Sequence, residues 1–288
     1  MKIALVGHFC FDIHHAGNGS DEERPGGIFN AAAMLSRIAG RSNTIVPVFG
    51  IAKEDYAQVA GLLEELPGVS TDGVYKLDAP TNRVHVYSTP EGKSVACSKD
   101  IAPPIPFDRL RRHVSADGIL INMISGFDIT LETLDQIRML AREEKTVIHF
   151  DFHNLTLGLN ERHERFRRPV EAWRRWAFML DTVQLNEEEL LGLDAAISDE
   201  RSIVGHILTL EVRGVLVTRG ADGVTVYLDT QKHVSRQDIK IVPSDGEDLI
   251  GSGDRFGAAF LYSLVTSNDI PGSARTAVES LSRTLNHN

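Results

Sequence analysis

Residues 248–256 read Asp-Leu-Ile-Gly-Ser-Gly-Asp-Arg-Phe and run directly into a helical pattern. Apolar side chains then recur at the spacing of one helix face, at Phe256, Ala259, Phe260 and Leu264. The small-residue turn Gly251-Ser252-Gly253 therefore leads into the N-terminus of a predicted helix. Such a turn can direct several backbone N–H groups at one point, and the helix dipole adds partial positive charge there. The stretch predicts an anion-binding turn that ends at Asp254.

Asp254 lies at the start of this predicted helix, where the ionised form of a carboxylate is favoured. It is therefore suited to accept a proton from a hydroxyl group that attacks a phosphoryl group. Base catalysis of this kind contributes roughly 10²- to 10⁴-fold to a rate. Locally, a tight turn in which Asp254 only caps a helix explains the residues equally well.

Before this turn in the chain, short apolar runs alternate with segments of helical spacing. The runs are rich in β-branched residues and lack in/out alternation, which is typical of strands buried on both faces. The predicted strands are 3–6, 45–49, 119–121, 147–150, 215–217 and 224–227, and the predicted helices include 29–38, 131–140 and 203–210. The alternation predicts an α/β fold with a mostly parallel central sheet and helices on both faces.

One region departs from this rhythm. Residues 83–87 and 94–98 flank Pro90-Glu91-Gly92-Lys93, which is a strong turn signal, and 83–87 alternates polar and apolar residues. Together with the polar stretch 13–24, the hairpin predicts a small β lid, formed by about 12–25 and 80–99, over one edge of the sheet. Two ordinary surface excursions are the alternative.

Two polar turns in the second half of the chain are further candidates for a binding site. Asn186 and Glu189 are three residues apart at a predicted helix start, where an amide and a carboxylate suit magnesium-bound water. An N-cap Asn with an acidic first turn is the ordinary alternative. Thr218, Gly220 and Gly223 lie in a strand–glycine turn–strand segment.

A third candidate lies near the N-terminus. Gly26-Gly27 precedes Asn30 and an Ala-rich helical segment, and this turn would let a polar ligand approach the backbone. The Asn30 side chain offers both a donor and an acceptor. Asp12 follows the first strand and is placed to accept hydrogen bonds from hydroxyl groups. Taken singly, a turn and a solvated loop carboxylate remain the simpler interpretation.

Composition limits the classes of function. The 288 residues fit one large α/β domain, and the formal net charge of -10 argues against nucleic acid as a main partner. The basic stretch 162–175 is preceded by Glu161 and interrupted by Glu164 and Glu171, and it is interpreted as a solvated helix face. With only Cys10 and Cys97, no signal peptide and no apolar run of 18 residues, the chain is expected to be cytoplasmic, reduced and free of membranes.

Other nucleotide-binding and hydrolytic motifs do not fit. The P-loop pattern comes closest at Gly92-Lys93-Ser94, but position 87 is Tyr instead of Gly. The first strand is not followed by the glycine pattern of dinucleotide-binding folds, and Gly-x-Ser-x-Gly does not occur. His149 and His153 lie at a predicted strand end, which makes a shared metal site improbable.

Taken together and in this order, the segments resemble the ribokinase-like (PfkB-type) carbohydrate kinase family over nearly the whole chain. The resemblance implies a single ribokinase-like domain over 1–288 with a small β lid. It implies an acceptor site at Asp12, Gly26, Gly27 and Asn30, an ATP-binding turn at Thr218, Gly220 and Gly223, and a magnesium motif at Asn186 and Glu189. Asp254 would be the catalytic base, and the backbone of Gly251, Ser252 and Gly253 the anion hole.

The implied activity is ATP- and Mg²⁺-dependent phosphorylation of a hydroxyl of a sugar or nucleoside. The resemblance is also compatible with a homodimer that forms through the lid. A catalytically silent sugar- or nucleoside-binding protein on the same fold is the alternative. Three departures from the family pattern stand out. Leu249 replaces a Thr, which leaves activation by a monovalent cation open; Ser252 replaces an Ala; and the Asp-x-Asn segment appears only as Asp151-Phe152-His153-Asn154.

Overall fold

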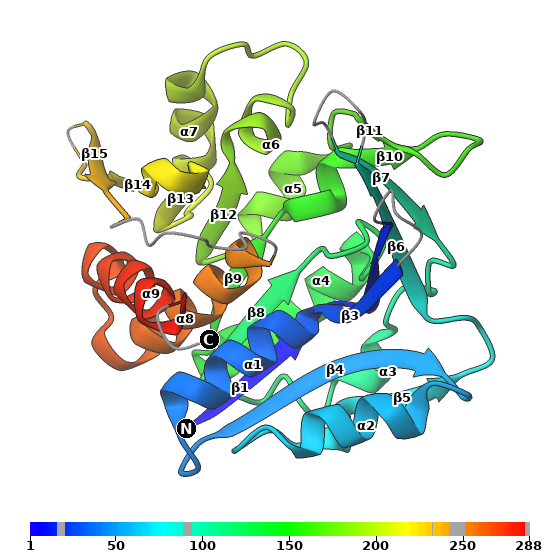
Figure 1. Ribbon diagram of the computed structural model, residues 1–288. Coiled ribbons are helices and arrows are strands. Elements are labelled where there is room, and N and C mark those ends of the chain that lie inside the picture. The colour runs from blue at the N-terminus through cyan, green and yellow to red at the C-terminus, as the bar shows by residue number, and fades with distance from the viewer. Residues whose placement is uncertain (16–20, 89–93, 232, 242–250, 286–288) are drawn as a thin grey trace.

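The computed structural model describes residues 1–15, 21–88, 94–231, 233–241 and 251–285. Its main element is a nine-stranded sheet in the order β15-β14-β13-β12-β9-β8-β1-β4-β5 (Figure 1). All neighbouring pairs from β13 to β5 are parallel, whereas β14 and β15 are antiparallel additions at one edge. The strands are β1 (Lys2–Val6), β4 (Thr44–Ala52), β5 (Val74–Leu77), β8 (Gly118–Asn122), β9 (Val147–Asp151), β12 (Thr182–Asn186), β13 (Gly214–Thr218), β14 (Val224–Asp229) and β15 (Val234–Ile239).

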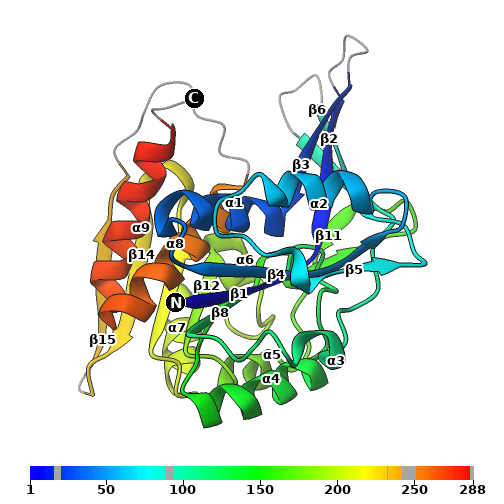
Figure 2. The same ribbon diagram turned by 90° about the horizontal axis from the view of Figure 1, so that it is seen from below.

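Helices cover both faces of this sheet. Figure 2 shows α1, α2 and α8 on one side of the strands and α3, α4 and α5 on the other. The predicted α/β class with a mostly parallel sheet is therefore confirmed. The helices are α1 (Ile28–Ala39), α2 (Tyr56–Glu64), α3 (Phe107–Leu110), α4 (Leu131–Glu144), α5 (Trp173–Phe178), α6 (Glu187–Leu191), α7 (Glu200–Leu208), α8 (Ser252–Ser267) and α9 (Ile270–Leu285). Short 3₁₀ turns occupy Thr71–Gly73, His153–Thr156 and Gly220–Asp222.

The core follows directly from the apolar runs of the sequence. All five residues of β8 are buried, as are the last four of β1 and β9. A strand buried on both faces has no solvent side, so its sequence reads as a continuous apolar run. On the helices, the buried residues recur at helical spacing, as in α4 at Leu134, Ile137 and Ala141. Each predicted strand and helix has a counterpart; most are slightly longer than predicted, while the helix predicted at 203–210 begins earlier and ends at Leu208.

A second, four-stranded sheet stands apart from the first. Its order is β3-β2-β6-β7, with β2 (Phe9–His15), β3 (Asp21–Gly27), β6 (Asn82–Ser88) and β7 (Ser94–Lys99). Strands β2 and β3 pair antiparallel, as do β6 and β7, and β2 pairs parallel with β6. Figure 2 shows β2, β3 and β6 projecting beyond the helices of one face. The predicted small β sheet is confirmed, while the turn at 90–93 lies outside the described residues.

The interpretation of 162–175 as one solvated helix face is wrong. The segment contains β11 (Arg165–Arg167), which pairs with β10 (Leu157–Leu159), and only its end is helical, in α5. Arg165 is half-buried: its guanidinium donates to Ser98 Oγ at 2.7 Å and to the carbonyl of Ser125 at 2.8 Å. Burial lowers its pKa to about 10. Pro169 lacks a backbone N–H and separates the strand from the helix.

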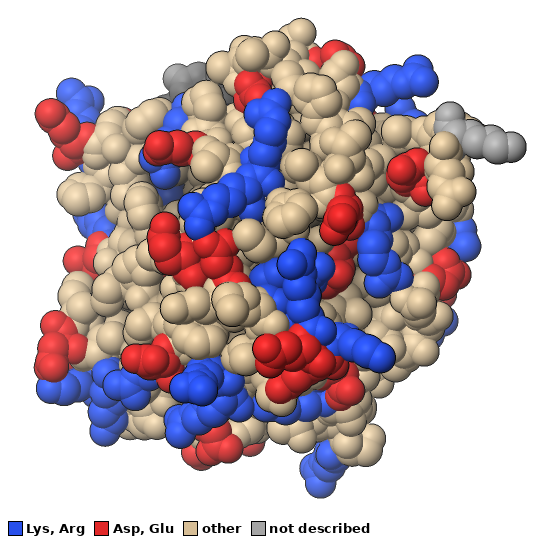
Figure 3. Space-filling view, turned by 180° about the vertical axis from the view of Figure 1, so that it is seen from behind, with Lys and Arg blue, Asp and Glu red and all other residues tan. Residues whose placement is uncertain are grey.

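The surface carries both signs of charge. On the face in Figure 3, Lys and Arg side chains alternate with Asp and Glu side chains. Ion pairs among the described residues include Arg138 with Asp181 at 3.0 Å and Arg174 with Asp194 at 3.1 Å. Among the described helices, none has the length and apolar character needed to cross a membrane.

Candidate active site

A cavity of about 570 Å³ lies where the small sheet meets the carboxyl ends of the central strands. Ligand sites in open parallel sheets form at this edge, because successive loops there enclose a crevice. The cavity is lined by residues from both sheets and from the start of α8: Cys10, Asp12, His14, Gly27, Asn30, Val84, Val86, Ile124, Asp151, His153, Asn154, Gln184, Asn186, Glu189, Thr218, Gly220, Gly251, Ser252, Gly253 and Asp254. It therefore includes most of the candidates chosen from the sequence.

The N-terminus of α8 forms one wall of this cavity. Gly251 precedes the helix with φ 69°, in the left-handed region, and a side chain there would meet Asn30 Nδ2 at 2.3 Å. Glycine is therefore required at 251 on both backbone and packing grounds. The carbonyl of Gly253 accepts a hydrogen bond from Gln184 Nε2 at 3.0 Å, which joins the turn to β12. Residues 248–250, which include Leu249, lie outside the described part of the chain.

Asp254, in the first turn of α8, is held by two side-chain amides. Asn30 Nδ2 donates to Oδ2 at 3.2 Å, and Asn122 Nδ2 donates to Oδ1 at 2.8 Å. Each carboxylate oxygen thus receives one donor, which fixes the orientation of the group while leaving further lone pairs for a ligand. The side chain is only 6% exposed, but it lines the cavity.

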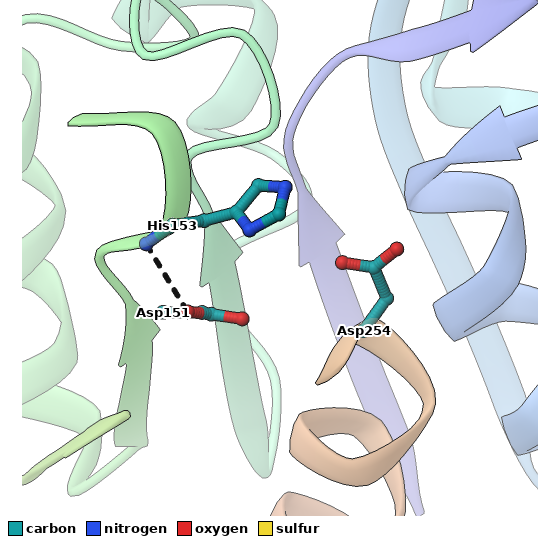
Figure 4. Close-up of side chains that lie close together, drawn as sticks. All are labelled: Asp151, His153 and Asp254. Carbon is teal, nitrogen blue, oxygen red and sulfur yellow. Dashed lines mark hydrogen bonds between the residues drawn. The ribbon is translucent and has the colours of Figure 1, made fainter. Parts of the chain in front are cut away.

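Asp151, His153 and Asp254 approach one another across the cavity (Figure 4). One donor atom from each lies within 4.8 Å of the others, so the residue types could hold a metal ion. The Asp151 carboxylate is already engaged: Oδ1 accepts the backbone N–H of His153 at 3.2 Å, and Oδ2 accepts from Gln184 at 2.9 Å. With Asp254 held by two amides as well, a charge cluster explains these contacts better than a metal centre.

Burial and mutual repulsion shape the ionisation of this cluster. Burial raises the pKa of Asp151, and the neighbouring carboxylates of Glu189 and Asp254 raise it further. Burial acts to lower the pKa of His153, but the surrounding carboxylates, Asp254 first, outweigh it and the pKa is raised. The positive form of the imidazole is therefore favoured among these acids.

The residues expected to bind the acceptor compound lie on the side of the cavity next to the small sheet. Asp12 Oδ1 accepts from the Cys10 thiol at 3.4 Å, and burial raises the pKa of both groups. A side chain at Gly26 would meet Asp12 Oδ2 at 2.1 Å, so the glycine leaves room for that carboxylate. Gly27 precedes α1 with φ 60° and delivers Asn30 to the cavity.

The residues expected to bind the phosphate donor line the other side of the cavity, except for Gly223. Asn186 and Glu189 form a reciprocal cap: Glu189 accepts from the backbone N–H of Asn186 at 2.8 Å and from its Nδ2 at 2.7 Å. Burial raises the pKa of Glu189. Thr218 and Gly220 line the cavity, whereas Gly223 does not. Gly223 has φ 98°, and a side chain there would meet the carbonyl of Ile239 at 2.0 Å, so it serves the turn.

The chain is similar in sequence to one protein family. Residues 163–283 match the family model described as pfkB family carbohydrate kinase. The predicted resemblance to the PfkB family is confirmed. No curated protein matches the chain.

Solved structures agree with this family in their fold. A pyrophosphate-dependent kinase in the ribokinase family superposes with a TM-score of 0.79 and 20% identity, over 99% of this chain and 95% of that chain. Ribokinase from Arabidopsis thaliana gives 0.72 and 19%, over 96% and 89%. A nucleoside kinase from Burkholderia thailandensis gives 0.72 and 14%, over 100% and 92%. The chain therefore has the ribokinase-like fold.

Sequence reasoning missed several residues at the site of this ribokinase-like chain. Asn122 binds Asp254 and is the lone polar side chain of the apolar strand β8, while Gln184 binds the start of α8 from the middle of β12. A lone amide in a buried strand is a signal, because burial without a hydrogen-bond partner is costly. His153, for which the sequence predicts no role, lines the cavity, as do Asn154 and His14.

A separate polar network lies beside the cavity and is sealed from it. Asp128, with 0% exposure, accepts from the backbone N–H groups of His8 at 2.6 Å, Ser125 at 2.9 Å and Gly126 at 3.0 Å, and from Ser125 Oγ at 3.0 Å. His8 Nδ1 lies 2.9 Å from Ser125 Oγ, and its Nε2 lies 3.2 Å from the carbonyl of Pro103. Although the residue types are those of a hydrolytic triad, none of the three lines the cavity.

Proposed function

We propose that the chain transfers a phosphoryl group from ATP to a hydroxyl group of a sugar or nucleoside. The observation that carries this proposal is the position of Asp254. Its oriented carboxylate lies at the N-terminus of α8, in a cavity with polar turns on two sides. A helix N-terminus favours phosphate, and the adjoining carboxylate suits a base for the attacking hydroxyl.

In the proposed reaction, Asp254 accepts the proton of the acceptor hydroxyl as that oxygen attacks the γ-phosphorus of ATP. A new phosphorus–oxygen bond forms to the acceptor, the bond to the β-phosphate oxygen breaks, and ADP leaves. The backbone N–H groups of Gly251, Ser252 and Gly253 stabilise the charge on the transferred group. Asp254 then releases its proton to solvent. Asn30 and Asn122 keep the carboxylate aligned for both events.

The acceptor site is assigned to Asp12, Gly26, Gly27 and Asn30, beneath the small sheet, which we propose to act as a lid. A vicinal diol matches a carboxylate next to an amide, since the diol can donate to the first and accept from the second. Among the described residues that line the cavity there is no Lys or Arg. An acceptor without a phosphate or carboxylate group of its own fits this lining best.

The donor site is assigned to Thr218 and Gly220, with Gly223 shaping the turn. Because the described lining holds the carboxylates of Asp12, Asp151, Glu189 and Asp254 and no Lys or Arg, a bound phosphate chain needs a cation. Asn186 and Glu189 offer the oxygen ligands that Mg²⁺ prefers, and each Glu189 oxygen, which accepts one hydrogen bond, keeps a further lone pair for contact through water. When bound, Mg²⁺ would neutralise charge on the donor phosphates.

The solved structures suggest which compounds to test. Ribokinase from Arabidopsis thaliana is complexed with ribose and ATP, and the Burkholderia thailandensis nucleoside kinase with inosine. A pyrophosphate-dependent kinase of the ribokinase family is complexed with a pyrophosphate analogue and myo-inositol. Pyrophosphate is therefore the second donor to examine, and a cyclic polyol belongs in the acceptor panel.

The test combines each donor with a panel of pentoses, hexoses, inositols and nucleosides in the presence of Mg²⁺. Phosphorylated product is identified by mass spectrometry, for the wild type and for Asp254→Asn prepared in parallel. We expect product from the wild type and roughly 10²- to 10⁴-fold less from the variant. Equal product from both proteins would indicate a contaminating kinase. Acceptor binding without product from the wild type would favour the silent binding protein.

A further inference from the structure

The charge of the cavity is unusual for a protein that binds phosphates. Its described lining contains the carboxylates of Asp12, Asp151, Glu189 and Asp254, but no Lys or Arg. Phosphoryl groups are normally bound by charge-assisted hydrogen bonds from cationic side chains as well as by metal ions and backbone N–H groups. The lining includes two histidines that could supply such a cation, His14 on β2 and His153 after β9.

His153 is held towards the cavity by an unusual backbone conformation. Its φ is 37°, in a positive region that side-chain-bearing residues seldom adopt. Two hydrogen bonds maintain this conformation: the backbone N–H donates to Asp151 Oδ1 at 3.2 Å, and the carbonyl accepts from Thr156 Oγ1 at 3.0 Å. Figure 4 shows the imidazole directed into the space that Asp254 also faces. Strained backbone of this kind is concentrated at functional sites.

The ring nitrogens of His153 have no hydrogen-bond partner among the described residues, although the residue lines a cavity crowded with acids. Carboxylates act on the ring from several elements: Asp254 of α8, Asp151 of β9, Glu189 of α6, Asp128 after β8 and Asp12 of β2. These acids outweigh the effect of burial and raise the pKa of the imidazole. The unpartnered ring nitrogens are therefore available to a ligand, and the positive form of the ring offers two N–H donors.

We propose that His153 is a catalytic residue that donates a charge-assisted hydrogen bond to the phosphoryl group in transfer. This inference rests on the proposed kinase function and deepens it, because it adds a cation within the segment Asp151-Phe152-His153-Asn154, where the chain departs from the family's Asp-x-Asn pattern. The lateral charge of the transferred group would then be shared between the imidazolium and the backbone of Gly251, Ser252 and Gly253. Asp254 keeps its role as base on the attacking side.

The first experiment measures steady-state kinetics for His153→Asn with the donor concentration varied at a saturating acceptor. Asn is tolerated in the left-handed region, so this variant removes the positive ring without imposing backbone strain. We expect kcat/KM for the donor to fall about 10- to 100-fold, the range for one hydrogen bond to a charged group, with KM for the acceptor unchanged. The matched control is His206→Asn, an exposed histidine on α7, with wild-type kinetics expected.

A second variant separates a chemical role from a structural one. His153→Gly accepts the positive φ freely and leaves a space of the size of the ring. We expect added imidazole to restore part of its activity, and not that of Asp254→Asn. Elemental analysis tests the alternative that His153 binds a transition metal. If the variant loses bound metal in proportion to its loss of activity, His153 is a metal ligand and the proposal is overturned. Unchanged donor kinetics in His153→Asn would also overturn it.

The inference can be tested even if the kinase proposal fails. Calorimetry with inorganic pyrophosphate and Mg²⁺ measures phosphate binding without turnover, in the wild type and in His153→Asn. At least tenfold weaker binding by the variant supports the role of His153, whether or not any acceptor is phosphorylated. Equal binding by the two proteins contradicts it. Absence of product from the wild type in every acceptor assay would count against the kinase function alone.

Discussion

Two aspartates in this molecule lie in similar polar surroundings and differ in what they leave free. Asp128 accepts four hydrogen bonds, from His8, Ser125 and Gly126, which matches the roughly four acceptor positions of a carboxylate. Asp254 accepts two, from Asn30 and Asn122, and its remaining lone pairs face a cavity. The first group is saturated by its own chain, and the second is available to a ligand.

The difference shows that residue type alone does not identify an active site. The Asp128 network contains Ser, His and Asp, which would suggest nucleophilic chemistry, but it is buried and complete. The Asp254 network is built mostly from amides, which orient a carboxylate without neutralising it. Accessible lone pairs, rather than the presence of reactive side chains, separate the reactive network from the structural one.

The largest expected effect belongs to Asp254→Asn. Loss of the base should lower kcat by roughly 10²- to 10⁴-fold, while the unfolding temperature changes by only a few degrees, because the side chain contacts the cavity and two amides. Kinetics and thermal unfolding on the same preparation check both parts. A large loss of stability with little loss of kcat per folded molecule would place Asp254 with the structural networks.

The opposite pattern is expected for Asp128→Asn. An amide at 128 cannot accept from all three backbone N–H groups, so buried donors are left unpaired and the free energy of unfolding should fall by about 3 kcal/mol. Urea unfolding measures this loss. At low temperature the folded protein should retain kcat within a few fold. A kcat as low as that of Asp254→Asn, in folded protein, would contradict the contrast.

A pH effect of intermediate size is expected from the buried His149, whose Nε2 lies 3.3 Å from Oε1 of the cavity residue Gln184. Burial lowers its pKa to about 4, so the native state holds it neutral, whereas the unfolded chain binds a proton below about 6.5. Stability is therefore lost as the pH falls below 6.5, by about 2 kcal/mol at pH 5. Urea unfolding at pH 7 and 5 should show this loss of unfolding free energy in the wild type and not in His149→Asn. An equal change in unfolding free energy between the two pH values in both proteins would refute this role of His149.

The smallest effect is expected for Asn122→Leu. Asn122 Oδ1 is buried and has no hydrogen-bond partner among the described residues, so the substitution also removes an unsatisfied carbonyl and should alter stability little. Loss of the hydrogen bond to Asp254 should lower kcat about tenfold with KM nearly unchanged. Kinetics and urea unfolding together test this positioning role. A loss of stability with normal kcat would make Asn122 a structural residue.

Much of the fold was predictable from the sequence because its signals are local. The apolar runs at 3–6 and 119–121 became β1 and β8, and the alternation at 83–87 became β6 of the small sheet. A helix does begin at this turn, with Gly251 before it and Ser252–Asp254 in its first turn, and Asn30 and Glu189 line the same cavity as Asp254. Their chemical roles remain predictions. The basic segment around Arg165 was misassigned, because its burial depends on partners more than 35 residues distant.

Residues within a few positions of one another set the order of strands and helices, the glycine turns and the presence of Asp254 at a helix start, so these features can be predicted from the sequence. Which polar groups meet depends on the tertiary structure. The amides that orient Asp254 lie 224 and 132 residues away from it in the chain. The same holds for the acids around His153 and for the saturation of Asp128, since burial and hydrogen bonding depend on strands that adjoin only after the sheet has formed.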